Sequence, residues 1–118
     1  MSRARREAWG RFAETLAAMS LRLRGYQVVA RRFRTPLGEI DLIVRRGRLL
    51  AFVEVKARLE REQALEAIAP RQRERTERSA ELFLAIHPRY RDYDLRFDVV
   101  AVRPWRLPHH LSDAWRPG

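Results

Sequence analysis

Alternating apolar and charged positions are clearest between residues 38 and 58, which read GEIDLIVRRGRLLAFVEVKAR. In the first half the apolar positions are even-numbered, at Ile40, Leu42 and Val44, and in the second half they are odd-numbered, from 49 to 55. A period of two is typical of a strand with one apolar face. We therefore predict two antiparallel strands joined by a tight turn around Gly47, with a charged face opposite the apolar one.

The charged face of this hairpin brings together Glu39, Asp41, Glu54 and Lys56. With the turn around Gly47, Asp41 lies opposite or diagonal to Glu54, roughly 5 to 8 Å away. Two carboxylates that close on an apolar sheet surface repel each other and are poorly solvated, so they need a cation. Oxygen ligands favour a hard divalent ion such as Mg²⁺. Lys56 follows Glu54 by two positions and points into the same site.

The rest of the chain predicts helices on either side of the hairpin and a further strand. The expected elements are helices at 2–24, 60–69 and 70–86 and strands at 26–34 and 95–102. A helix between two strands of one sheet implies a parallel crossover. The resulting order, αβββαβ, predicts an α/β protein with a mixed sheet flanked by helices, in a single domain over residues 1–118.

The last residues, from about 104 to 118, do not show a clear periodicity. His109 and His110 have no partner at the spacing of metal ligands, so we expect a packed or frayed tail rather than a metal site. We expect Asp98, in the last strand, to be structural and to pair with an arginine.

The net charge of the chain limits the classes of partner that we expect it to bind. The chain carries 25 basic and 15 acidic residues, a net charge of +10, which favours a polyanion: nucleic acid first, an anionic membrane surface second. Cysteine is absent, which excludes disulfides and thiolate metal sites and is typical of a reducing cytoplasm. No apolar run approaches membrane-spanning length, so we expect no membrane insertion and a cytoplasmic location.

Lys56 stands out because it is the only lysine, all other basic residues being arginine. A compact ammonium beside two convergent carboxylates suggests a role that a planar guanidinium cannot fill. The simpler alternative is that the composition of the chain favours arginine and that position 56 is a lysine by chance.

The strings GEIDLI at 38–43, FVEVKAR at 52–58 and RFDVV at 96–100 resemble the YraN family of predicted endonucleases, which is related to archaeal Holliday-junction resolvases. An Asp followed one strand later by Glu-x-Lys is similar to the PD-(D/E)xK nuclease superfamily. The resemblance covers residues 9–102. It implies a restriction-endonuclease-like αβββαβ core, and it implies that Glu14 of the first helix joins the acidic cluster.

Together these features predict a metal-dependent endonuclease that hydrolyses DNA phosphodiester bonds. Asp41, Glu54 and the Val55 carbonyl would hold Mg²⁺ or Mn²⁺, and Lys56 would orient water or stabilise the transition state. Gln72 lies on the buried stripe of its helix, where it either contacts a phosphate or metal-bound water or simply packs. Arginines expected to flank the site and hold the nucleic-acid backbone are Arg32, Arg34, Arg45, Arg46, Arg58 and Arg71.

Two alternatives use the same fold: an RNA-processing nuclease, and a nucleic-acid-binding module without catalysis. We also expect a homodimer that acts on branched DNA. This expectation rests on the resemblance to resolvases and on Trp105 and Trp115, apolar residues in excess of what a solvated tail needs.

Overall fold

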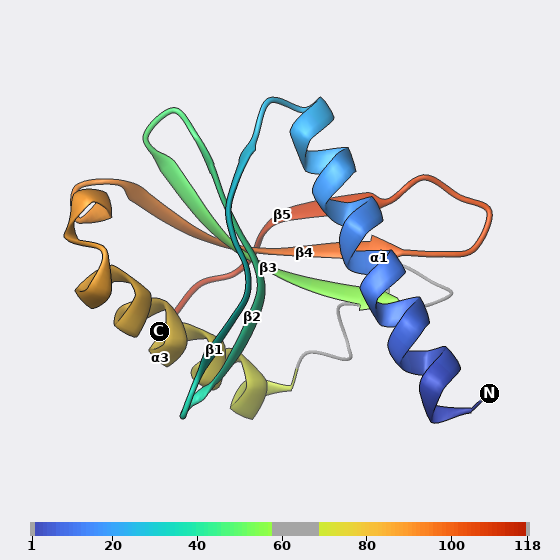
Figure 1. Cartoon of the computed structure of the whole chain (residues 1–118). Helices are drawn as coiled ribbons and strands as arrows, with labels where there is room; N and C mark the ends of the chain where they lie inside the picture. Colours follow the sequence, from blue (N-terminus) through green and yellow to red (C-terminus); the bar gives the residue numbers. More distant parts are fainter. Residues whose placement is uncertain (1, 58–68, 118) are drawn as a thin grey trace.

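The fold is a five-stranded mixed sheet with one long helix on each face (Figure 1). A computed structural model describes residues 2–57 and 69–117. The helix expected at 60–69 falls almost wholly on residues 58–68 and so lies outside the described residues. The elements are α1 (Arg3–Leu23), β1 (Gln27–Thr35), β2 (Gly38–Arg46), β3 (Leu49–Ala57), α3 (Pro70–Ile86), η1 (Pro88–Tyr90), β4 (Asp94–Val102) and β5 (His109–Trp115).

The strands lie in the order β1-β2-β3-β4-β5. Neighbours are antiparallel except β3 and β4, which are parallel and are connected through α3. This confirms the predicted α/β class and the αβββαβ order, including the parallel crossover. No helix in the described part of the chain is long and apolar enough to cross a membrane.

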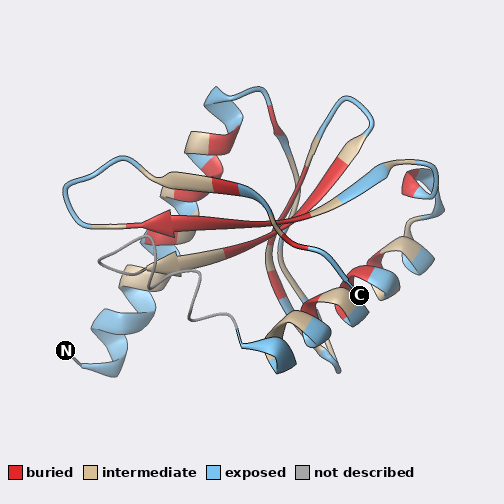
Figure 2. Cartoon of the chain, turned by 180° about the vertical axis from the view of Figure 1, so that it is seen from behind, coloured by how far each residue is buried: buried red, intermediate tan, exposed pale blue. Residues whose placement is uncertain are grey.

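Two apolar layers form the core, one on each face of the sheet (Figure 2). Three fully buried alanines of α1 let its backbone approach the face that carries Leu42 and Val53. On the other face Phe83 of α3 packs against Phe52, with ring centroids 6.2 Å apart. The alanines are Ala13, Ala17 and Ala18.

The prediction that one face of the hairpin is apolar and the other charged was therefore wrong in part. Both faces are apolar along the middle of β2 and β3. The carboxylates and Lys56 lie at one end, and Arg45 and Arg46 lie at the turn. Ile40 also departs from the expected alternation, because it packs in the layer under α3 whereas Leu42 and Val44 pack under α1.

The expected tail contains a fifth strand, β5, which pairs antiparallel with β4. The buried carboxylate of Asp98 anchors it: His110 Nε2 lies 2.7 Å from Oδ2, and the backbone N–H of Asp113 donates to Oδ1 at 3.0 Å. Arg96 donates to both oxygens, at 2.8 and 2.7 Å. Burial raises the pKa of Asp98, but the hydrogen bonds from His110 and Arg96 outweigh burial and lower it. Asp98 is thus structural and paired with an arginine, as predicted.

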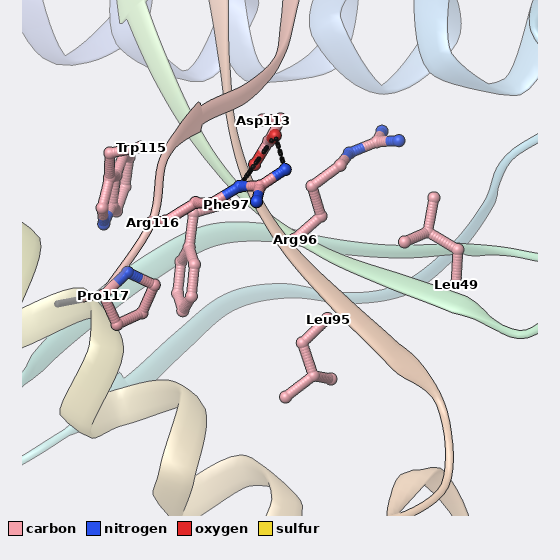
Figure 3. A pocket seen from close by; sticks show the side chains of 8 residues that line it. All are labelled: Leu49, Leu95, Arg96, Phe97, Asp113, Trp115, Arg116 and Pro117. Atoms are coloured by element: carbon pink, nitrogen blue, oxygen red, sulfur yellow. Dashed lines mark hydrogen bonds and ion pairs between the residues drawn. The ribbon is translucent and has the colours of Figure 1, made fainter.

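Trp115 belongs to this anchored strand and not to a free surface. Its indole stacks on Phe97 (Figure 3), with centroids 5.2 Å apart. The indole N–H donates to Glu77 at 3.0 Å. The expectation that Trp115 covers a partner was wrong, since its own core buries it. Trp105, in contrast, is fully exposed.

Replacing Asp98 with Asn is expected to lower the free energy of unfolding by about 3 kcal/mol, because Arg96 then keeps a partly buried charge without a counter-charge. The matched control is Asp113→Asn, which breaks the exposed ion pair with Arg116 (2.8 Å, Figure 3) and should cost far less than Asp98→Asn, because water screens an exposed pair. Urea unfolding of both variants measures the difference. Equal losses would show that β5 is not held by Asp98.

Candidate active site

The predicted site lies at a fork where β2 leaves β3. The β2–β3 pairing ends at Leu42↔Val53, whereas β1 and β2 remain paired to Thr35↔Gly38, so the first two strands run on together away from the third (Figure 1). Asp41 is the first residue beyond the last pair. Its Oδ2 accepts the backbone N–H of Val55 at 2.8 Å. A side-chain oxygen thus takes the place of a strand carbonyl and fixes Asp41 against β3.

The far end of the β1–β2 hairpin is fastened to α3. Thr35 Oγ1 accepts the N–H groups of Leu37 and Gly38 at 3.0 Å and lies 3.0 Å from Ser79 Oγ of α3. A Cβ at Gly38 would stand 3.2 Å from Arg75 Cβ, and its φ of +156° disfavours other residues. Glycine therefore allows the hairpin to touch α3, which holds the fork open.

Glu54 projects from β3 toward α3 and is almost fully buried. Gln72 Nε2 donates to Glu54 Oε2 at 3.1 Å, and Lys56 Nζ donates to Gln72 Oε1 at 3.4 Å. Gln72 therefore bridges Glu54 and Lys56. Of the two readings left open for Gln72, the structure places it in contact with the site.

Thr76 is a site residue that sequence reasoning missed. Its Oγ1 lies 3.4 Å from Glu54 Oε1 and 3.1 Å from the carbonyl of Gln72 one turn earlier. The available signal was its spacing of four from Gln72, which puts both side chains on one face of α3.

The two carboxyl groups resist being ionised at the same time. Burial raises the pKa of Asp41 to about 6, partly offset by the hydrogen bond from Val55. Burial and the charge of Asp41 raise the pKa of Glu54 to about 8, opposed by the charge of Lys56. One lysine thus does not neutralise the pair, and a cation would favour the ionised form of both groups.

The oxygen donors present fit a hard divalent cation such as Mg²⁺. Asp41, Glu54 and the Val55 carbonyl would hold it. No group of three His, Cys, Asp or Glu residues within 2–57 and 69–117 comes together as a metal site. The ion would therefore take its other ligands from water or from substrate oxygens.

Glu14, the acidic residue implied by the resemblance, lies next to this pair but is engaged by an arginine. Arg32 Nε donates to Glu14 Oε1 at 2.8 Å, and the charge of Glu14 contributes to the raised pKa of Asp41. Arg32 has an unusual φ of +52°. A ligand role for Glu14 stays a prediction.

The structure divides the predicted arginines into three groups. Arg71 lines the cavity of Asp41, Glu54 and Lys56, together with Arg75, which was not predicted. Two more line the adjoining depression beside Glu14, namely Arg32 and Arg34.

Arg45 and Arg46 do not flank the site, and the expectation that they do was wrong. They pair with Leu50 and Leu49 at the β2–β3 turn, so about five residues of strand, roughly 16 Å, separate Arg46 from Asp41. Arg58 lies outside the described residues.

The metal-free protein is expected to lose stability as pH rises from about 5 to 8. The pKa of Glu54 is higher in the folded chain (about 8) than its usual 4.5, so the native state binds more protons over this window and stability falls with pH. A loss of roughly 2 kcal/mol from this residue is expected, and Glu54→Gln should remove it. Urea midpoints in EDTA at both pH values give the measurement.

The exposed Glu81 of α3 supplies the control, because Glu81→Gln should keep the slope of the unaltered protein. Added Mg²⁺ should restore stability at pH 8 in the unaltered chain but not in Glu54→Gln. A protein equally stable at pH 5 and 8 in EDTA would contradict the prediction.

Comparison with known proteins places the whole site within one family. The model of the uncharacterised protein family UPF0102 matches residues 13–102, which include Glu14, Asp41 and Glu54. A UPF0102 protein of Parvibaculum lavamentivorans is 63% identical over 105 residues, covering 89% of this chain and 79% of its own length. One from Paramagnetospirillum magneticum is 50% identical, covering 91% and 86%. One from Maricaulis maris is 49% identical, covering 100% and 94%. The chain therefore belongs to the uncharacterised protein family UPF0102.

Proposed function

We propose that this chain is a metal-dependent endonuclease that hydrolyses DNA phosphodiester bonds. The observation that carries the proposal is the fork between β2 and β3, where Asp41 and Glu54 meet beside Lys56. Carboxylates paired in this way, with an ammonium in reach, suit the hydrolysis of an anionic ester. The PD-(D/E)xK resemblance supports the same reaction.

Each residue then has a distinct task. Asp41 and Glu54, with the Val55 carbonyl, hold the ion. When bound, Mg²⁺ or Mn²⁺ polarises a phosphoryl oxygen and lowers the pKa of a coordinated water. Lys56, positioned by its 3.4 Å hydrogen bond to Gln72, places a positive charge where negative charge develops on the phosphorus oxygens. Gln72 keeps Lys56 and Glu54 at a set separation.

Binding is expected to be electrostatic. Arg71 and Arg75 border the cavity and Arg34 lies beside it, so the backbone of the nucleic acid would be held without reading its sequence. DNA is the proposed substrate. RNA is the alternative substrate, and binding without catalysis is the alternative function.

A substrate panel tests the proposal. Linear, nicked, flapped and four-way DNA and matched RNA are incubated with Mg²⁺, Mn²⁺ or EDTA. Metal-dependent cleavage of DNA is expected, and the Asp41→Asn/Glu54→Gln double variant, purified identically, controls for contaminating nucleases. Cleavage of RNA alone would support the RNA-processing alternative. Binding without cleavage of any substrate would support the binding module.

We further propose that a homodimer acts on branched DNA. Trp105 and Leu107 are exposed and border one cavity with Trp9 and Phe12 of α1, which offers an apolar surface to a second copy. Sedimentation at micromolar concentration, with and without a four-way junction, tests this. A monomer in both cases, with no preference for the junction, would contradict it.

A further inference from the structure

Seven arginines gather at the end of the molecule opposite the candidate active site. They come from the C-terminal end of α1, at the top of Figure 1, and from the β2–β3 turn and the η1 segment, at its upper left. All three lie away from the N-terminus of α3 and the tip of the β1–β2 hairpin. The β2–β3 turn is bonded to the start of β4, which follows η1, since the N–H of Asp94 donates to the carbonyl of Arg48 at 2.9 Å. We call this surface the arginine end: Arg22, Arg24, Arg45, Arg46, Arg48, Arg89 and Arg91.

Neutral groups hold the arginines of the β2–β3 turn in place. Arg45 donates to the amide of Gln27 at 2.8 Å and to the hydroxyl of Tyr93 at 2.9 Å. Arg46 lies over the ring of Tyr26, 4.3 Å from its centroid, and donates to the carbonyl of Arg24 at 3.2 Å.

Two further guanidinium groups are placed over tyrosine rings. Arg48 lies 5.1 Å from the centroid of Tyr93, and Arg89 lies 5.0 Å from that of Tyr90. Cation–π contacts and hydrogen bonds to neutral acceptors orient a guanidinium without cancelling its charge. Four guanidinium groups of the arginine end are therefore pre-organised and keep their charge, although the exposed Asp92 and Asp94 lie in the adjoining loop.

Of the fifteen arginines elsewhere in the described residues, five form ion pairs with carboxylates. Examples are Arg32 with Glu14 at 2.8 Å and Arg96 with Asp98 at 2.7 Å. Within residues 2–57 and 69–117, in contrast, no arginine of the arginine end forms an ion pair with a carboxylate. Arginines that only face solvent do not need ordered positions. For arginines that bind a polyanion, ordered positions lower the entropic cost of binding.

We infer that the arginine end is a second nucleic-acid-binding surface, which contacts phosphates of the same substrate at a distance from the cleavage site. Arg46 lies about 16 Å along β2 from Asp41, which corresponds to about five phosphate steps of one strand. A nucleic acid carries charge at regular spacing over such a length, and the net charge of +10 suits it. The inference rests on the proposed function for one point, namely that the partner is a nucleic acid.

The test is binding, measured in EDTA so that it does not depend on cleavage. The combined substitutions Arg46→Gln, Arg48→Gln and Arg89→Gln remove three charges from the arginine end. Fluorescence anisotropy with a duplex of about 20 base pairs should show roughly 30-fold weaker binding, and the log-log salt slope should fall by about 2 to 3. Circular dichroism checks that the variant folds, and the single exposed substitution Arg48→Gln, with a slope change of about 0.9, tests the same point.

The matched control removes three exposed arginines outside the arginine end by Arg78→Gln, Arg106→Gln and Arg116→Gln. Because the net charge is the same, this control should bind within about threefold of the unaltered chain. Equal losses in the two triple variants would overturn the inference and leave net charge as the cause. An equal loss of binding to polyglutamate would overturn the assignment of a nucleic acid as the partner.

Discussion

Replacing either carboxylate of the fork is expected to reduce metal-dependent DNA cleavage by at least about a thousandfold. In Asp41→Asn and Glu54→Gln the side-chain shape is kept, but one negative oxygen ligand of the ion is lost. Folding and DNA binding should persist, because both variants relieve the repulsion that raises the pKa of the pair. Initial cleavage rates at saturating Mg²⁺, with affinity measured separately, give the comparison.

Glu81→Gln again serves as the control, since Glu81 is exposed on α3, and its cleavage rate should stay within about twofold of the unaltered chain. Metal rescue adds a second check: Mn²⁺, which accepts amide ligands more readily than Mg²⁺, should restore more activity to Asp41→Asn than Mg²⁺ does. Undiminished Mg²⁺-dependent cleavage by both variants would refute the site.

The second large effect is expected from Lys56→Arg, which keeps the charge and yet should lower the cleavage rate roughly 10- to 100-fold. The guanidinium is planar and larger than an ammonium, so it cannot occupy the same point beside Glu54 while donating to Gln72. DNA affinity should change little, which places the loss in the chemical step.

The opposite exchange supplies the control. Arg71 is exposed and lines the same cavity, so Arg71→Lys keeps a mobile charge there and should alter the rate by less than about threefold. If Lys56→Arg were fully active, the presence of a single lysine in this chain would be a coincidence of composition.

The hairpin and its carboxylates could be predicted from sequence because they depend on local rules. A period of two and a glycine turn bring Asp41 near Glu54 in the register of the hairpin. The parallel crossover followed from a helix lying between two strands. The family resemblance added Glu14. In the structure Glu14 pairs with Arg32, and its charge contributes to the raised pKa of Asp41.

Other features depend on contacts between distant segments, which periodicity does not encode. The fork requires Thr35 and Gly38 to meet Ser79 and Arg75 of α3, and it moves Ile40 to the opposite layer of the core. β5 was missed because polar contacts to Asp98 hold it, rather than an alternating apolar face. The position of Arg46 was mispredicted because a period of two tells which face of a strand a residue lies on and not how far it lies along the strand.

The fork has a consequence for how the activity of this chain can be tuned. Its two carboxylates lie on different parts of the sheet, Asp41 on the β1–β2 hairpin and Glu54 on β3. The contact of the hairpin with Ser79 sets the angle between the hairpin and β3. Their separation is thus adjustable from the tip of the β1–β2 hairpin, without altering any atom that would touch the proposed ion. Selectivity between a small and a larger divalent ion depends on cavity size and flexibility, so metal preference can change through substitutions at the hairpin tip, remote from the reaction.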